Sequence, residues 1–485
     1  MAVSADIFLD LVSIVSLPVI LAIFSYVNPI IAFTRKITAA AYWVEALIIG
    51  CIFWPILMGQ TQGLVINENF RIDRLAVCFL LLTAFVFAAA LTHADFLFGQ
   101  EETDEHGTLK SVRLKTFYLC INLFFLSMCS IFVSNNLGCL WMSIEATTLS
   151  SAPLVYFERT KNALEATWKY LIVCSVGIAL ALLGTVFIFA ASQHGHLEQG
   201  TLIITDLISQ ADKLDYPLMR FGFILCLLGY GTKAGIFPLH SWLHDAHSEA
   251  PAPASAILSG ALLNGALFGI WRITQIIMGS HFHNQIMQIL LGMGAITVLA
   301  AALFLIRQHG FKRMWAYSSI ENVGIMLVAI GLGSAALFFL QAINHSIVKV
   351  ALFLLSGNIV HAGGSKKLYN LHGILKSCPA WGCLLTLGLF AITGAPPFGT
   401  FLSKISILAA LADRGSWILI GILLFATSLA FMSLSVHVGR VLFGGAKTDF
   451  QAFKVFQTSV VPIILLCCSV ILGLVIFPSY WSFIK

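Results

Sequence analysis

A lysine, Lys233, lies inside an apolar run of this 485-residue chain, and it needs a chemical explanation. A charged side chain near the centre of a bilayer costs at least about 2.5–3.5 kcal/mol, so a buried lysine needs a partner or a function. Glu145 lies about eight residues into an earlier apolar run, or roughly 12 Å along a helix. We therefore expect an ion pair between Glu145 and Lys233 that proton arrival would perturb. The alternative is a static pair that joins two helices.

Other apolar runs also contain ionisable side chains. His345 and Lys349 are four residues apart and share one helical face, where imidazole beside lysine suits a proton relay. Glu321 is expected about three residues into its helix, and Lys169 about six from an end, so either could reach the membrane surface instead. The candidate proton-transfer residues are therefore Glu145, Lys233, His345, Lys349, Lys404, Lys169, Glu321 and His240.

Prolines beside two of these lysines predict helix breaks. Pro238 follows Lys233 and removes one backbone hydrogen bond, and Pro396 and Pro397 precede Lys404. Breaks at membrane depth are tolerated where they line water, which favours a transport role. A kink without any transport role is the alternative.

A histidine-rich connection follows the first break. His240, His244 and His247 lie beside Asp245 and Glu249, a composition that resembles a metal site. The segment is short and is followed by prolines, so we expect a proton relay or a structural loop and no metal ion.

Composition places the chain among polytopic membrane proteins. It is 59% hydrophobic and 10% charged, with a mean hydropathy of +0.93, whereas soluble proteins carry about 25% charge. The net charge of +5 forms no dense basic patch, which argues against nucleic-acid binding. The eleven cysteines are scattered without a CxxC motif, and no phosphate loop or haem-attachment motif occurs. We expect no cofactor, so any redox chemistry would come from partner subunits.

The apolar pattern predicts an all-α protein with about fourteen transmembrane helices. The expected segments lie near residues 7–27, 37–59, 72–92, 116–134, 138–157, 163–191, 219–238, 254–278, 284–306, 318–334, 336–361, 380–411, 416–440 and 458–482. With both termini outside, sixteen of the 27 Lys and Arg residues fall on the inner side and six on the outer side. This bias supports that orientation.

An internal repeat is suggested by recurring residues, although coincidence is an alternative. The tripeptide Ser-Ile-Glu occurs at 143–145 and again at 319–321, and lysines recur at a similar offset. The fourth to eighth and the ninth to thirteenth helices would then form two five-helix units. Because five is odd, the second unit would be inverted.

Three motifs carry a family resemblance: TKAGIFPLHSWLHDAHSEAPAPASAIL, FKRMWAYSSIENVGIM and HSIVKVALFLLSGNIVHAGG. They are similar to the antiporter-like membrane subunits of respiratory complex I, Mrp-type sodium/proton antiporters and energy-converting hydrogenases. The segments SSIENVG, LEATWKY and APPFGTFLSK resemble the hydrogenase branch of this family. Within that branch they are most similar to the formate-hydrogenlyase type, whose membrane component is hydrogenase-4 component F. The resemblance covers nearly two-thirds of the chain, from the fourth to the thirteenth helix.

The resemblance implies fourteen helices, inverted five-helix repeats, discontinuous seventh and twelfth helices, and a mid-membrane line of charged residues. It divides the chain into N-terminal helices at 1–115, repeats at 116–280 and 281–443, and a last helix at 444–485. By motif, Glu145 and Lys233 match the family's fifth-helix glutamate and seventh-helix lysine. His345 and Lys349 match the central relay of the eleventh helix, and Lys404 the twelfth-helix residue.

One departure bears on the proton path. Many relatives carry lysine or histidine on the eighth helix, where this chain has Ser259 and Asn264, which hold no proton at neutral pH. The favoured hypothesis is a proton-translocating subunit of an oxidoreductase complex in a bacterial inner membrane, with antiporter-like and peripheral redox subunits as partners. The alternatives are a membrane scaffold with a vestigial channel and a sodium/proton antiporter subunit.

Overall fold

The computed structural model describes residues 5–61, 63–101, 107–194, 200–445 and 455–484. Within these residues the chain is built from helices, apart from a two-stranded antiparallel hairpin of β1 (Leu64–Asn67) and β2 (Phe70–Ile72). Eight helical stretches of the described chain are long and apolar enough to cross a membrane. The expected all-α membrane protein is therefore confirmed.

The chain divides into two compact units. Unit 1 comprises Met1–Ala88, Glu102–Gly235 and Ala261–Ile289, and unit 2 comprises Ala89–Glu101, Ile236–Gly260 and Leu290–Lys485.

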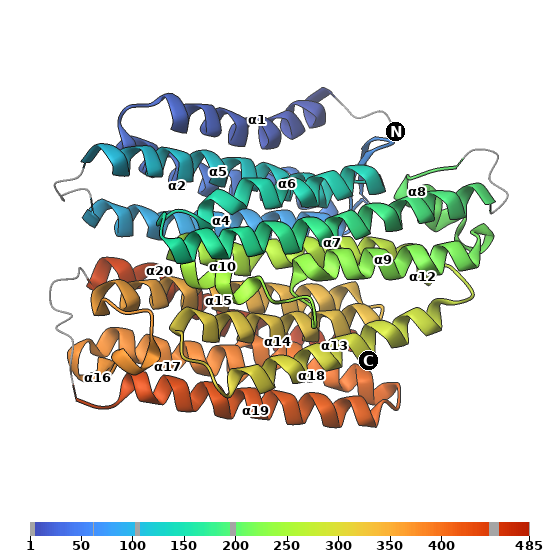
Figure 1. Cartoon of the computed structure of the whole chain (residues 1–485). Helices are drawn as coiled ribbons and strands as arrows, with labels where there is room; N and C mark the ends of the chain where they lie inside the picture. The colour runs from blue at the N-terminus through green and yellow to red at the C-terminus, as the bar shows by residue number, and fades with distance from the viewer. Residues whose placement is uncertain (1–4, 62, 102–106, 195–199, 446–454, 485) are drawn as a thin grey trace. The chain divides into compact units, whose positions relative to one another are not determined.

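The helices of unit 1 run alongside one another (Figure 1). They are α1 (Ala5–Val27), α2 (Ile31–Ile52), α3 (Trp54–Leu57), the first part of α4 (Arg74–Glu101), α5 (Gly107–Val133), α6 (Leu137–Val155), α7 (Lys161–His194), α8 (Ile204–Ser209), η1 (Ala211–Lys213), α9 (Tyr216–Ala234) and α12 (Leu263–Met278). An ion pair between Arg272 of α12 and Asp73, which immediately precedes α4, links distant parts of this unit.

Small residues bring α7 and α9 into backbone contact. A β-carbon added at Gly229 would lie 2.5 Å from the carbonyl oxygen of Gly177, and one added at Gly184 would lie 2.7 Å from that of Gly222. In membranes, small residues at a helix interface allow the backbones to approach closely, and glycine, which has no β-carbon, allows the closest approach. The position of α9, which carries Lys233, is therefore fixed against α7.

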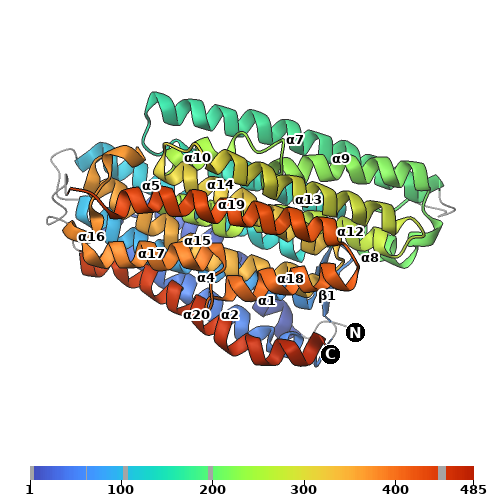
Figure 2. The same ribbon diagram turned by 90° about the horizontal axis from the view of Figure 1, so that it is seen from below.

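Unit 2 contains the remaining helices, and α19 lies along α17 and α18 (Figure 2). They are α10 (Leu243–Glu249), α11 (Ala252–Ile257), most of α13 (His283–Leu305), α14 (Phe311–Gly331), α15 (Ala335–Gly363), η3 (Leu368–Asn370), α16 (Ile374–Ser377), α17 (Pro379–Thr393), α18 (Gly399–Asp413), α19 (Trp417–Leu442) and α20 (Val455–Ile484). A π-helical turn, η2 (Leu258–Leu262), joins α11 to α12. Gly294 of α13 and Gly324 of α14 make another close contact, since a β-carbon at either would lie 2.8 Å from the other's carbonyl oxygen.

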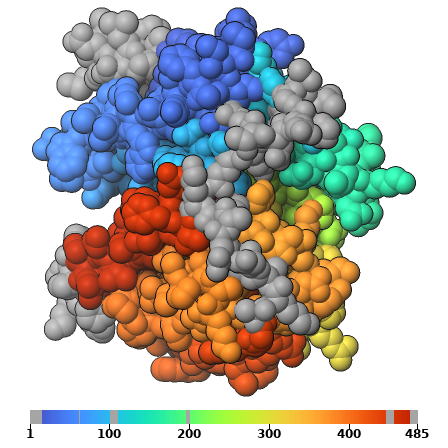
Figure 3. All heavy atoms as spheres, turned by 90° about the vertical axis from the view of Figure 1, so that its left-hand side faces the viewer, coloured from blue at the N-terminus to red at the C-terminus, as the bar shows by residue number. Residues whose placement is uncertain are grey.

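Several connections of unit 2 meet at one end of this unit, where Figure 3 draws the chain near α16 in orange. The amide of Phe311 donates to the carbonyl of Lys366 at 3.0 Å, and the amide of Leu368 donates to that of His309 at 2.8 Å. The ring of His372 bonds the carbonyl of Arg440 at 3.0 Å. Loops that the sequence assigned to one side of the membrane thus meet at one end of this unit.

One expected segment needs correction, and another is interrupted where the sequence predicted. The helix expected at 318–334 begins at Phe311, because its first turn has acceptors for both of its charges: Lys312 Nζ donates to the Ala250 carbonyl at 2.7 Å and Arg313 pairs with Asp245 at 2.9 Å. The long segment expected at 380–411 is two helices, α17 and α18. Its interruption lies at the expected prolines.

Candidate proton-transfer sites

The helix that carries Lys233 ends directly after it. Ala234 is the last residue of α9, and Gly235 adopts φ +79°, a left-handed conformation that favours glycine. The expected break before Pro238 is therefore confirmed. Lys233 occupies the final turn, where the unpaired carbonyls at a helix C-terminus favour a cation.

Lys233 is fully buried in unit 1 and its ammonium group is well satisfied. Its Nζ donates to Thr148 Oγ1 at 2.8 Å and to the Tyr170 hydroxyl at 2.7 Å. The Tyr170 hydroxyl also bonds Ser151 Oγ at 2.6 Å. Hydrogen bonds from a charged donor to two hydroxyls offset part of the cost of burying the lysine.

Glu145 joins this site through a hydroxyl rather than by direct contact. Thr148 Oγ1 donates to Glu145 Oε2 at 3.1 Å, and Ser175 Oγ donates to the other carboxylate oxygen at 3.3 Å. The expected direct ion pair between Glu145 and Lys233 is thus wrong. Thr148, one turn after Glu145, stands between the two charges and connects them in one chain of hydrogen bonds.

Lys169 pairs with another residue of its own helix. Its side chain is 48% exposed and pairs with Glu165 at 2.7 Å, four residues earlier on α7. Such exposed pairs typically contribute about 0–1 kcal/mol. This exposure fits the alternative that the Lys169 side chain reaches the membrane surface.

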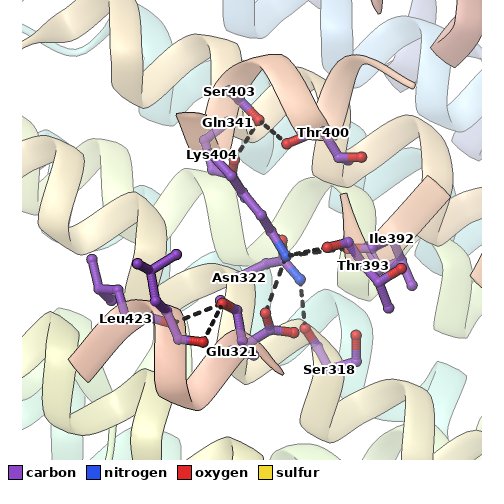
Figure 4. Close-up of polar contacts among 12 residues, drawn as sticks. Ser318, Glu321, Asn322, Gln341, Ile392, Thr393, Thr400, Ser403, Lys404 and Leu423 are labelled. Carbon is purple, nitrogen blue, oxygen red and sulfur yellow. Dashed lines mark hydrogen bonds and ion pairs between the residues drawn. The ribbon is translucent and has the colours of Figure 1, made fainter. Parts of the chain in front are cut away.

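In unit 2, Lys404 stands after the second helix break (Figure 4). The last residue of α17 is Thr393, and Gly394 follows with φ +89°. Lys404 Nζ lies 3.2 Å from Glu321 Oε1 and also reaches the carbonyls of Ile392 at 3.4 Å and Thr393 at 3.3 Å. The break therefore supplies acceptors for the lysine.

Glu321 is a buried partner, not a surface acid. It lies in the middle of α14 and its side chain is 3% exposed. The expectation that it sits near the start of its helix is corrected, since α14 begins earlier than the apolar pattern indicated. Beside it, Ser403 donates to Gln341 at 2.6 Å and Gln341 donates to Asn322 at 2.8 Å (Figure 4).

His345 and Lys349 are both buried in α15 of unit 2, four residues apart. Lys349 Nζ donates to the Trp315 carbonyl at 2.7 Å and lies 5.6 Å from the centre of that indole ring. The ring of His345 interacts with the backbone of Ser259, but neither ring nitrogen makes a hydrogen bond of ordinary geometry to the described residues. Ser259 Oγ in turn bonds Ser319 Oγ at 2.9 Å.

The histidine-rich connection is packed among rings. His240 contacts Phe237, Phe304 and Tyr317, with ring centres 5.6, 5.4 and 6.1 Å away. His247 stacks on Phe353 at 4.8 Å. Across the described residues, no three His, Cys, Asp or Glu side chains form a group that could hold a metal ion.

Sequence reasoning missed the two hydroxyl groups that hold Lys233. The spacing of Thr148 from Glu145 was readable, because residues three apart share a helical face. Tyr170 had no such signal, since its role depends on the contact between α6, α7 and α9.

A family described as NADH:quinone oxidoreductase/Mrp antiporter, TM, matches residues 134–430. A hydrogenase-4 component F homolog from Methylacidiphilum infernorum is 39% identical over 391 residues, which are 79% of this chain and 81% of that protein. The A component of the Na(+)/H(+) antiporter of Alkalihalophilus pseudofirmus is 28% identical over 85% of this chain, but only 52% of its own length is matched. The N component of NADH-quinone oxidoreductase of Desulforudis audaxviator is 26% identical over 76% of this chain and 71% of that protein.

Solved structures support the same fold. A chain of the membrane-bound sulfane sulfur reductase, an archaeal respiratory membrane complex, superposes with a TM-score of 0.83 at 23% identity, over 97% of this chain and 95% of that one. A chain of the Mrp complex from Dietzia gives 0.83 at 17% identity over the same shares. This chain belongs to the family of antiporter-like membrane proteins shared by NADH:quinone oxidoreductases and Mrp antiporters.

Proposed function

We propose that the protein is a proton-translocating membrane subunit of a multisubunit oxidoreductase of the hydrogenase or complex I type. The observation that carries this proposal is the continuous hydrogen-bond chain from Lys233 through Thr148 to Glu145. Lys404 and Glu321 form a second lysine–acid pair beside a helix break. The similarity to a hydrogenase-4 component F homolog favours the hydrogenase branch.

The Thr148 hydroxyl is oriented for proton transfer. It accepts a hydrogen bond from the Lys233 ammonium and donates one to the Glu145 carboxylate. When Lys233 passes a proton to Thr148 while Thr148 passes its own to Glu145, the ammonium becomes an amine and the carboxylate becomes an acid, with the hydroxyl restored. Reversal of these two transfers recharges the pair.

The full arrangement belongs to this proposal. It comprises fourteen membrane spans. An N-terminal part at 1–115 precedes inverted repeats at 116–280 and 281–443, and a last helix at 444–485 follows them. Both termini would lie on the outer side of a bacterial inner membrane. Protons would move along the mid-membrane line of Glu145, Lys233, His345, Lys349 and Lys404, driven by neighbouring redox subunits. The glycine-flanked breaks beside Lys233 and Lys404 support half-channels at these two places.

The test is proton translocation by the assembled complex in sealed vesicles. We expect Lys233→Ala and Glu145→Gln complexes to assemble but to lose most of their proton translocation, while Lys213→Ala, which alters an exposed lysine of η1, keeps it. Normal translocation by an assembled Lys233→Ala complex would show that this function is wrong.

A second candidate is a role in sodium/proton antiport, which the likeness to the A component of a Na(+)/H(+) antiporter favours. Sodium prefers sites of several oxygen ligands, by analogy with other hard cations. A sodium-dependent proton flux that disappears in Glu145→Ala vesicles would support it. A scaffold role would instead leave pumping intact after every lysine substitution, with assembly lost only when the whole protein is deleted.

A further inference from the structure

Helix α2 turns polar side chains inward and apolar ones outward. Its buried residues are Thr34, Arg35, Thr38, Ala39, Tyr42, Glu45 and Ile49, which recur every three or four positions and so form one helical face. Its exposed side chains include Phe33, Trp43, Val44 and Leu47. A membrane helix with this pattern directs a polar stripe into the protein.

Glu45 is the one acid among the buried residues of α2. It is fully buried, and neither carboxylate oxygen has a hydrogen-bond partner among the described residues. No cation of the described residues pairs with it, and its electrostatic neighbours are the phenol of Tyr42 and the thiol of Cys129. An ionised carboxylate without a partner is too costly in such a place, so Glu45 carries a proton in this conformation.

A hydrogen-bond network lies one helical turn from Glu45. The Tyr42 hydroxyl donates to Asn122 Oδ1 at 2.7 Å, and Asn122 Nδ2 lies 3.3 Å from Ser25 Oγ. Cys129 lies two turns beyond Asn122 on α5, so one face of α5 follows the stripe. All of these residues belong to unit 1.

Buried aromatic rings pack around Tyr42. Tyr42 contacts Phe125 of α5 at 4.6 Å and Phe87 of α4 at 5.7 Å between ring centres. A proton therefore approaches Glu45 along the polar stripe rather than across these rings. The stripe extends to Arg35 and Thr34 in the first turns of α2.

We infer that Glu45 is a proton-binding site of its own, reached along Arg35, Thr38 and Tyr42 and distinct from the sites at Lys233 and Lys404. Uptake converts a hydronium ion and the carboxylate into water and the neutral acid, and release is the reverse. The inference rests on the proposed function, because a proton that exchanges here must be part of the translocated flow. Glu45 matches none of the motifs that carried the family resemblance.

The first test is chemical labelling of the assembled complex in vesicles with dicyclohexylcarbodiimide, which reacts with protonated carboxyl groups in apolar surroundings. Mass spectrometry should find the adduct on Glu45, with a yield that is higher at acidic than at alkaline pH. Glu145, which accepts hydrogen bonds from Thr148 and Ser175, is the matched comparison and should be labelled much less. An unlabelled Glu45 across the pH range would overturn the inference.

The second test separates proton exchange from packing. Glu45→Gln keeps the shape of the side chain but holds no exchangeable acid proton, and we expect it to slow proton translocation by roughly 10²-fold. Glu45→Asp should restore part of the rate, which a purely structural role would not require. If Lys233→Ala stops translocation and Glu45→Gln leaves it unchanged, the Glu45 site is wrong while the proposed function stands. If neither changes it, the proposed function itself fails.

Discussion

Lys233 in unit 1 and Lys404 in unit 2 both lie near a glycine-flanked helix break, but they meet their acids differently. Lys233 reaches Glu145 through the Thr148 hydroxyl, and Lys404 touches Glu321 at 3.2 Å. The acids also differ, since Glu145 is half-buried and Glu321 is 3% exposed. A hydroxyl between two charges allows proton transfer with little movement. A direct buried pair holds both charges in place until one of them is neutralised.

The largest difference should appear when each acid is neutralised. Glu321→Gln leaves Lys404 with only carbonyl acceptors, so we expect the free energy of unfolding to fall by about 4 kcal/mol. Glu145→Gln should cost about 1 kcal/mol or less, because Glu145 is half-buried and does not contact Lys233 directly. Titration of the two purified variants and the wild type with a denaturing detergent measures both losses in the free energy of unfolding. Equal losses would remove the distinction between the two sites.

The next effect concerns the ion pair that supports unit 1. Burial by itself raises the pKa of Asp73, but the charge of Arg272 and its hydrogen bond outweigh burial and hold that pKa below its ordinary value. The pair therefore stabilises the fold above pH of about 4, and this contribution is lost as pH falls through the lowered pKa. Asp73→Asn should lose about 2 kcal/mol at neutral pH.

Unfolding of the wild type and Asp73→Asn across acidic pH provides the check. The stability difference between them should shrink as the medium becomes more acidic. Proton translocation per assembled complex should change little, because Asp73 touches neither lysine site. A difference that stayed constant down to acidic pH would contradict the ion-pair explanation.

A smaller effect tests the bridging hydroxyl. Thr148→Val keeps the shape of the side chain but breaks the connection between Lys233 and Glu145, and we expect about tenfold slower proton translocation, or about 1.4 kcal/mol. Thr147→Val is the matched control, since among the described residues the buried Thr147 hydroxyl bonds only the Ile144 carbonyl, at 2.6 Å. If both variants pump at the same rate, Thr148 is not the bridge.

The smallest effect is expected at the exposed lysine of α7. Lys169→Ala removes an exposed ion pair with Glu165. The free energy of unfolding should therefore fall by less than about 0.5 kcal/mol. Translocation by this variant should match the wild type within error. A loss comparable to that of Lys233→Ala would place Lys169 in the proton path after all.

The sequence predicted the helical class, the positions of the two helix interruptions and the burial of Lys233, because each rests on a local signal such as an apolar run, a proline or a costly charge. It misplaced Glu321, since the basic first turn of α14 hid the true start of that helix. It could not place Thr148 between Glu145 and Lys233, because distances of a few ångströms depend on how α6 packs against α9.

Glu45 was missed although its signal was present. It is a lone acid in an apolar run, one turn from Tyr42, and its stripe of polar residues has helical spacing. The lysines of the middle of the chain recur beside prolines, which gives them a repeated local pattern. Glu45 has no such recurring counterpart, and its burial is what distinguishes it.

The glycine contacts have a mechanical consequence for the two lysine sites. In unit 1 they clamp the helix that carries the lysine, since α9 is pressed against α7 at Gly229 and Gly177. In unit 2 they clamp the helix that carries the acid, since α14 is pressed against α13 at Gly324 and Gly294. The helix held by glycine contacts therefore carries the positive charge in unit 1 and the negative charge in unit 2. If both sites work in the same cycle, movement of the other helix would shift the Glu145 carboxylate in unit 1 and the Lys404 ammonium in unit 2. Equal displacements would then move charges of opposite sign.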